Sequence, residues 1–218
     1  MQLNNKYIIV FILCLTWTYI LPAKAGEIVD DALQALQLDN AAGVEEGLKR
    51  GLDVNFVDSS GNSLLMLAAR EGSPKSAAVL INAGAKLYLR NAYGDDALLL
   101  ATFAGHEAIV DMLLAKGASL GANRSGWTPL HYAAYTGHAR LVKKFLALGS
   151  PVNAATQSGL TPLMVAAMNG HLELVKILLQ QGADPTLRDQ NNMSASDYAL
   201  AHKNTDIAEL LGKLLQRK

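Results

Sequence analysis

The sequence has little cysteine and no excess of charge of either sign. Cys14 is the single cysteine among 218 residues, so a disulfide within the chain is excluded. Basic and acidic side chains number 19 each, and they therefore create no net field that would attract nucleic acid or an anionic membrane. The sequence also lacks a basic stripe that could follow a phosphate backbone. We therefore expect no nucleic-acid partner.

Catalytic and cofactor motifs are missing as well. There is no GxSxG elbow, HExxH pair, P-loop or GxGxxG turn after a strand. His106, His138 and His171 recur at repeat spacing, which places them on the order of 10 Å apart, too far to share a zinc ion. We expect these imidazoles to bond the loops between helices. The sequence thus predicts no catalytic residue, no metal site and no cofactor.

Long apolar runs are confined to the N-terminus. Lys6 precedes an apolar segment over residues 7–21, and residues 23–25 have the small-x-small pattern that signal peptidase reads. The apolar segment is shorter than the roughly 18 residues of a spanning helix. We expect residues 1–25 to be a signal peptide cleaved after Ala25, which leaves a chain without cysteine or a membrane span in the bacterial periplasm. An uncleaved N-terminal anchor is the alternative.

The sequence does contain an internal repeat. GWTPLHYAAYTGH at residues 126–138 returns in outline as GLTPLMVAAMNGH at residues 159–171. Three interleaved series of positions share this spacing, with one shared single-residue deletion between Gly117 and Gly126. The series are Gly61, Gly94, Gly126, Gly159 and Asn192; Gly51, Gly84, Gly117, Gly149 and Gly182; and Gly72, Gly105, Gly137, Gly170 and Lys203. Such a period indicates a stack of small structural units.

Each unit has the pattern of two helices joined by a turn. A short side-chain oxygen recurs where the first helix would begin, and it can accept a hydrogen bond from a free backbone N–H. The residues at this position are Ser63, Asp96, Thr128, Thr161 and Ser194. Paired alanines such as Ala133 and Ala134 let neighbouring helices approach closely, and the following glycine suits a helix end. Because one helix pair cannot bury its apolar face alone, we expect the pairs to stack.

Both quoted phrases resemble ankyrin repeats, and the resemblance covers nearly all of residues 28–215. It implies an all-α fold, a solenoid of stacked helix-turn-helix units with hairpin-like turns, and a structural hydrogen-bonding role for His131. We expect an ankyrin repeat domain over residues 26–218. Its parts are a degenerate cap, four full repeats and a C-terminal cap, at residues 28–60, 61–93, 94–125, 126–158, 159–191 and 192–218. The repeat count at both ends is left open.

The resemblance also implies a binding surface. In ankyrin arrays the turn tips and the exposed side of the first helices form a concave wall that binds other proteins. The candidate partner-binding residues on this wall are Tyr93, Asp95, Phe103, Arg124, Trp127, Tyr135, Leu160 and Met168. Tryptophan, tyrosine and arginine often dominate interface energies. Alternatively, Phe103 or Met168 folds back to fill a gap between repeats.

The sequence therefore favours a non-enzymatic protein–protein interaction module that is monomeric when free and binds a periplasmic protein. One version of this hypothesis makes it a specific inhibitor or self-protection protein for a periplasmic enzyme. Two other interpretations stay open: a small-ligand or catalytic role within the array, and an envelope scaffold without a defined client.

Overall fold

The computed structural model describes residues 26–216, so the predicted signal peptide at residues 1–25 lies outside the described residues. Residues 26–37 are helical. The helices that follow are α2 (Ala41–Lys49), α3 (Leu64–Glu71), α4 (Pro74–Asn82), α5 (Ala97–Ala104), α6 (Glu107–Ala115), α7 (Pro129–Thr136), α8 (Ala139–Ala147), α9 (Pro162–Met168), α10 (Leu172–Gln180), α11 (Ala195–Ala201) and α12 (Thr205–Gln216).

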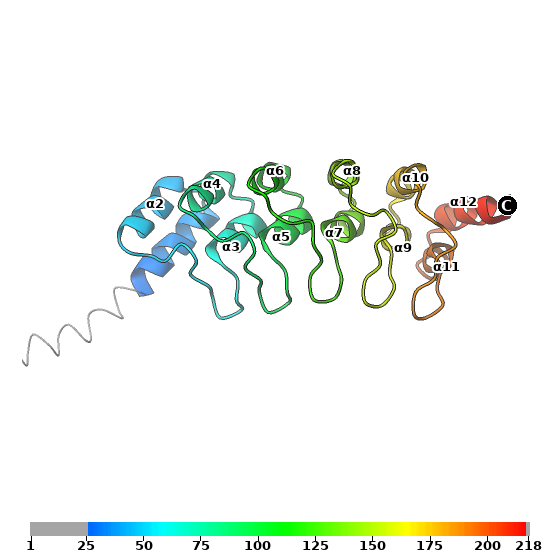
Figure 1. Ribbon diagram of the computed structural model, residues 1–218, viewed down its shortest axis with the longest axis horizontal. Helices are drawn as coiled ribbons and strands as arrows, with labels where there is room; N and C mark the ends of the chain where they lie inside the picture. The colour runs from blue at the N-terminus through cyan, green and yellow to red at the C-terminus, as the bar shows by residue number, and fades with distance from the viewer. Residues whose placement is uncertain (1–25, 217–218) are drawn as a thin grey trace, which may run out of the picture.

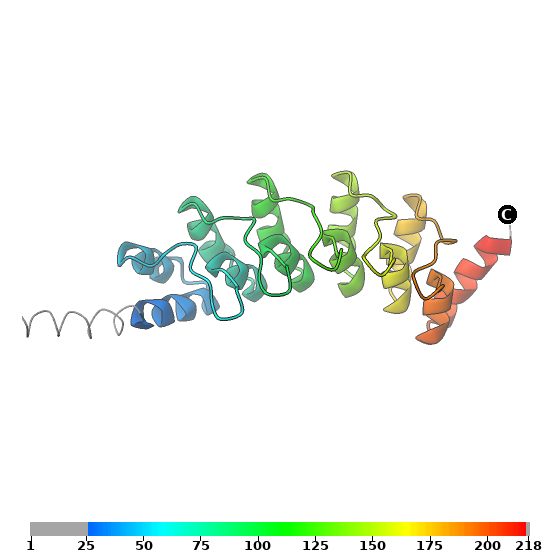
Figure 2. The same cartoon turned by 60° about the horizontal axis from the view of Figure 1, so that its bottom comes forward.

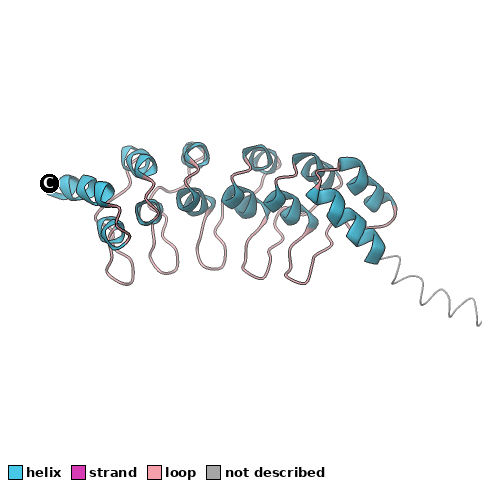
Figure 3. Ribbon diagram, turned by 180° about the vertical axis from the view of Figure 1, so that it is seen from behind, coloured by secondary structure: helices cyan, strands magenta, loops and turns pink. Residues whose placement is uncertain are grey.

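The helices stack in pairs to form an elongated array. Figure 1 shows α3, α5, α7, α9 and α11 following one another in a row, with α4, α6, α8 and α10 in a second row. The loops between successive pairs project from one side of the array, as the view turned by 60° also shows (Figure 2). Within residues 26–216 the β-structure is limited to an isolated bridge between Val57 and Ser63 (Figure 3). The expected all-α solenoid is confirmed.

The first helix of each unit begins where the sequence predicts it. Ser63, Thr128 and Thr161 have extended backbones, and each accepts a hydrogen bond from the N–H three residues ahead. Asp96 and Ser194 do the same at the start of α5 and α11. These oxygens satisfy N–H groups that have no partner within the helix. The predicted caps are therefore confirmed.

Histidines join consecutive units. His106 Nε2 lies 3.2 Å from the carbonyl oxygen of Arg70, and His171 Nε2 lies 2.9 Å from that of Tyr135. Both carbonyls belong to the last turn of the first helix in the preceding unit. The prediction that these imidazoles bond the loops between helices was wrong for His106 and His171, whose partners are helix carbonyl oxygens. The cause is the stacking, which brings the start of each second helix against the end of the previous unit's first helix.

The core runs without interruption along the array. Ala133, Ala134 and Ala166 are completely buried between neighbouring first helices, and Val142 and Phe145 of α8 are completely buried beneath them. Small side chains on the first helices permit close packing, and larger ones on the second helices fill the remaining space. None of the helices within residues 26–216 is both long enough and apolar enough to cross a membrane.

Each turn is organised by one short polar side chain. Asp58, Asn91, Asn123 and Asp189 occupy equivalent positions, and each accepts hydrogen bonds from the N–H groups two and four residues ahead. Burial alone would raise the pKa of Asp189, but hydrogen bonds from Tyr198 and the turn N–H groups lower it below its usual range. The turns are therefore held in one shape and present their tips in a regular row.

Candidate functional site

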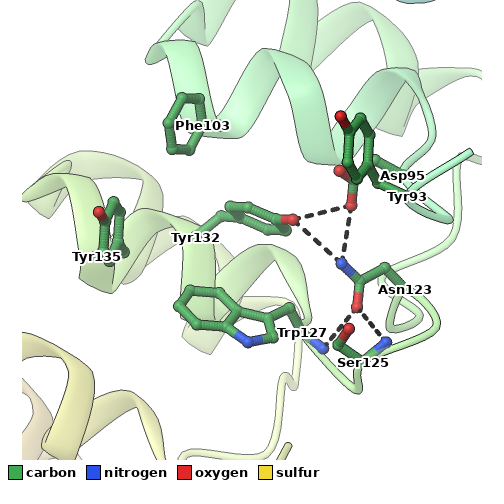
Figure 4. Close-up of a pocket in the computed structure, with 8 residues that line it drawn as sticks. All are labelled: Tyr93, Asp95, Phe103, Asn123, Ser125, Trp127, Tyr132 and Tyr135. Carbon is green, nitrogen blue, oxygen red and sulfur yellow. Dashed lines mark hydrogen bonds between the residues drawn. The ribbon is translucent and has the colours of Figure 1, made fainter. Parts of the chain in front are cut away.

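A pocket lined mainly by aromatic side chains opens between the unit that starts at Gly94 and the unit that starts at Gly126. It has a volume of about 440 Å³. We call it the aromatic pocket, and its lining residues are Tyr93, Asp95, Phe103, Asn123, Ser125, Trp127, Tyr132 and Tyr135 (Figure 4). Two turns and the two helices α5 and α7 supply these residues. The pocket thus lies on the face formed by the turns and the first helices.

The first turn presents Tyr93 and Asp95. Asn91 Oδ1 accepts hydrogen bonds from the N–H groups of both residues, each at 3.0 Å. Arg90 Nη1 donates to the carbonyl oxygen of Gly94 at 2.6 Å and fixes the tip between them. The side chain of Tyr93 is 74% exposed, whereas Asp95 is 8% exposed. One turn therefore places an aromatic ring at the rim and a carboxylate in the wall.

A polar network links Asp95 to the next unit. Tyr132 Oη donates to Asp95 Oδ1 at 2.8 Å, and Asn123 Nδ2 donates to the same oxygen at 2.9 Å. Asn123 Nδ2 also lies 3.1 Å from Tyr132 Oη, so the three side chains form a triangle (Figure 4). Burial and the hydrogen bond to Asp95 raise the pKa of the Tyr132 phenol above its usual range. The network fixes the Tyr132 ring in the pocket wall.

Four aromatic rings pack against one another beside this network. The Trp127 ring centroid lies 5.3 Å from that of Tyr132 and 5.8 Å from that of Tyr135. Phe103 lies edge-on to Tyr132 at 5.9 Å and stacks on Tyr135 at 6.2 Å. Such pairs stabilise one another beyond their buried area. Because Phe103 and Tyr135 remain 46% and 41% exposed, this ordered cluster keeps an accessible aromatic surface.

Five of the eight predicted partner-binding residues line the aromatic pocket. They are Tyr93, Asp95, Phe103, Trp127 and Tyr135. Asp95 is nearly buried and acts as a hydrogen-bond acceptor within the wall.

The other three predicted residues lie outside the lining. Arg124 is exposed and packs closely over the turn at Gly94. A Cβ atom added to Gly94 would lie 2.6 Å from Arg124 Cγ. Leu160 is half-buried, packs against the core, and accepts a hydrogen bond at its carbonyl from His131 Nε2 at 3.1 Å. Met168 is half-buried near the end of α9. The structure therefore separates these three residues from the aromatic pocket.

Three lining residues, Asn123, Ser125 and Tyr132, are absent from the predicted partner-binding set. Asn123 belongs to the series of turn-organising side chains, which is visible as a short polar residue at one repeat position. Tyr132 stands where three units carry Leu67, Leu100 and Val165 and the C-terminal unit carries Tyr198. The phenol of Tyr132 in place of an aliphatic side chain could have indicated from the sequence that this position lines a polar site.

Residues 26–216 include no group of three or more histidine, cysteine, aspartate or glutamate side chains that could hold a metal ion. His131 lies in the first turn of α7, and burial lowers its pKa. Its Nδ1 lies 2.8 Å from Thr128 Oγ1 and its Nε2 faces the Leu160 carbonyl. Both ring nitrogens thus serve the structure. The chemistry that the aromatic pocket offers is recognition by ring faces, one carboxylate and a few hydrogen-bonding groups.

Comparison with known proteins gives a family for these repeats. A family profile described as "Ankyrin repeats (3 copies)" matches residues 32–124, 65–155 and 130–216. The chain is 35% identical over 96 residues to a transient receptor potential cation channel subfamily A member 1 homolog of Caenorhabditis elegans, covering 44% of this chain and 8% of that protein.

Two further relatives have unlike names. Glycerophosphocholine phosphodiesterase gde1 of Schizosaccharomyces pombe is 35% identical over 119 residues, which is 52% of this chain and 10% of that protein. DNA replication inhibitor plutonium of Drosophila melanogaster is 37% identical over 95 residues, which is 43% of this chain and 55% of that protein. The matches cover only part of each relative, and the names describe different activities.

Proposed function

Since this chain belongs to the ankyrin-repeat family, whose arrays are protein–protein interaction modules, we propose that it binds a partner protein through the aromatic pocket and the turns around it. We propose further that it is not an enzyme and that it is monomeric when free. The unlike names of the relatives support a role in recognition, because the repeats are what these proteins share with this chain.

The observation that carries the proposal is an ordered aromatic cluster that stays exposed. Phe103 and Tyr135 of the cluster remain 46% and 41% exposed, and Tyr93 at the pocket rim is 74% exposed, so three adjacent units contribute exposed rings. Large rings held in place lose little conformational entropy on binding, and tyrosine and tryptophan are frequent interface hot spots. The second-helix face differs, since exposed or half-buried charged residues such as Lys143 and Lys144 of α8 stand on it. The turn side is therefore the better candidate for a binding surface.

We also propose that the protein acts in the bacterial periplasm. The support comes from the sequence: an apolar segment over residues 7–21 is followed by a small-x-small cleavage pattern at residues 23–25. The only cysteine, Cys14, lies within the segment that would be removed. An exported chain that starts at Gly26 would fold by packing alone, without disulfides.

Affinity capture from a periplasmic extract tests both proposals. The bait is the chain recovered from the periplasm of cells that produce the full sequence, and N-terminal sequencing of the bait should begin at Gly26. The double variant Tyr93→Ala/Tyr135→Ala removes two exposed rings of the aromatic pocket. We expect at least about a tenfold loss of the retained partner, since hot-spot rings contribute about 2 kcal/mol each.

Tyr88→Ala is the matched control. Tyr88 is 72% exposed, but it lines a different cavity. We expect this variant to retain the partner as the unaltered chain does, with all variants unfolding at similar urea concentrations. Equal retention by the double variant would contradict binding at the aromatic pocket. A bait found in the membrane with residues 1–25 attached would contradict the proposed location.

A further inference from the structure

We propose that the aromatic pocket receives a basic side chain, lysine or arginine, from the partner protein. The inference rests on the proposed function and adds the chemistry of the group that the pocket recognises. Two independent features carry it: the ring faces that line the pocket and the charge of Asp95.

The ring faces supply the first feature. Trp127, Tyr132 and Tyr135 line the same pocket, with ring centroids 5.3 Å and 5.8 Å from that of Trp127. The faces of aromatic rings are electron-rich, and tryptophan attracts a nearby cation most strongly. A volume of about 440 Å³ is more than a single side chain requires. The pocket therefore has room for an ammonium or guanidinium group beside these rings.

Asp95 supplies the second feature, because among residues 26–216 no basic group forms an ion pair with it. The donors to its side chain, Asn123 Nδ2 and Tyr132 Oη, are neutral and bond the same oxygen, Oδ1. Within residues 26–216, no lysine, arginine or histidine nitrogen lies within 4 Å of this carboxylate. The adjacent Asp96 differs, since Arg90 Nη2 lies 3.5 Å from its Oδ2. A nearly buried carboxylate without a counter-charge is stabilised when a cation arrives.

The charge of Asp95 is not required to hold the turns together. Asn62 occupies the same repeat position one unit earlier, is 7% exposed, and accepts a hydrogen bond from Asn91 Nδ2 at 3.0 Å. Asn123 makes the equivalent bond to Asp95 at 2.9 Å. A neutral amide thus performs this structural role at one junction, while the junction with the aromatic pocket carries a carboxylate. We assign the extra negative charge to ligand recognition.

The second oxygen of Asp95 is available to a ligand. Of the hydrogen bonds among residues 26–216, those to Asp95 side-chain oxygens end on Oδ1. Ser76 Oγ is the one fully buried side-chain nitrogen or oxygen without a hydrogen bond in this part of the chain. Asp95 Oδ2 is therefore not sealed from solvent. The neighbouring basic side chains do not pair with Oδ2 of Asp95. Arg90 bonds Asp96 and the Gly94 carbonyl, and Arg124 lies outside the pocket lining.

Fluorescence titration tests the inference without a partner protein. The sequence contains two tryptophans, so Trp17→Phe in the full chain leaves Trp127 as the only reporter. The probes are Nα-acetyl-arginine amide, Nα-acetyl-lysine amide and, as the neutral comparison, Nα-acetyl-norleucine amide. We expect saturable changes of Trp127 emission with both cations, and binding about tenfold weaker for norleucine.

Asp95→Asn is the decisive variant, because the amide oxygen can still accept from Asn123 and Tyr132 as Asn62 does at its own junction. We expect it to weaken binding of the two cations about fivefold to tenfold and to leave norleucine binding unchanged. Glu173→Gln removes one negative charge on α10, away from the aromatic pocket, and should change neither.

Three results would overturn the inference. They are equal binding of norleucine and the cations, an Asp95→Asn variant that binds the cations as before, and no saturable change with any probe. The titration is independent of partner capture. The cations could bind the pocket in the titration while the Tyr93→Ala/Tyr135→Ala variant still retains the partner in affinity capture. That result would contradict the proposed binding surface and leave the inferred preference for cations intact.

Discussion

At the scale of single residues, three side chains decide the character of the aromatic pocket. Tyr132 reaches back to Asp95 of the preceding unit, and Asn123, at the end of the same unit as Asp95, bonds the same oxygen. The contacts fix the tyrosine ring against Trp127 and Phe103. The proposed binding site therefore requires a junction between units, since no single unit contains all of these groups.

Tyr132→Phe should change how stability depends on pH. Burial and the bond to Asp95 raise the pKa of Tyr132 in the folded protein above the value of about 10 in the unfolded chain. The folded state then keeps a proton that the unfolded state has lost. This contribution is complete below about pH 10 and is lost as the pH rises toward the folded-state pKa.

The measurement is urea unfolding of both proteins between neutral pH and about pH 11. At neutral pH we expect Tyr132→Phe to lower the free energy of unfolding by about 2 kcal/mol, because a hydrogen bond to a charged group is lost. Above pH 10 the unaltered protein should lose stability more steeply than the variant. Tyr198 contributes equally to both curves and cancels in their difference. Parallel curves would show that the phenol is not held as described.

At the scale of elements, glycines at the helix ends have two different tasks. Gly105 has φ +77°, and a Cβ there would lie 2.4 Å from Cε1 of His138. Gly149 has φ +86°, but a Cβ there would meet no atom within 4 Å. Both positions favour glycine because of the left-handed backbone, and only Gly105 also admits a neighbouring imidazole.

Gly105→Ala should therefore cost more than Gly149→Ala. We expect Gly149→Ala to lower the free energy of unfolding by about 1 kcal/mol from backbone strain alone. Gly105→Ala should add about 2 kcal/mol, because the new methyl group displaces His138. Chemical denaturation of the two variants measures the difference, and adding His138→Ala to Gly105→Ala should recover part of it. Equal losses would mean that the imidazole does not pack tightly between units.

Much at this scale could be predicted from the sequence. The starts of α3, α7 and α9 follow from Ser63, Thr128 and Thr161, because a cap bonds an N–H only three residues away. The glycines that end the helices can be predicted for the same reason, because the left-handed backbone they adopt is set within one helix turn. Such features depend on neighbouring residues in the chain, so a repeat pattern reveals them.

The aromatic pocket was only partly predictable. Tyr132 and Asn123 act on Asp95 from positions 37 and 28 residues away, and nothing local in the sequence announces that contact. Met168 shares the repeat position of the exposed Phe103 and Tyr135, yet it is half-buried and outside the lining. Leu160 shares the repeat position of Asp95 and Trp127, yet it too lies outside the lining. Burial at a junction depends on the side chains of two units together, which spacing along one chain does not specify.

At the scale of the whole molecule, the array separates stability from recognition. The core runs between first and second helices along residues 32–211, while the aromatic pocket lies on the face of the turns. In a stack of this kind each unit contacts mainly its neighbours, so side chains on the turn face can change without disturbing the core. The protein can therefore present a specific surface on a common scaffold.

Site-specific photocrosslinking in bacteria that produce the full chain tests the central claim most directly. A photoreactive phenylalanine analogue replaces Tyr93 at the rim of the aromatic pocket, Tyr88 outside it, or Lys143 on α8. We predict a crosslinked protein partner from position 93 and none from position 143, with position 88 giving at most a weak product. A partner crosslinked from position 143 and absent at position 93 would contradict binding through the turn face.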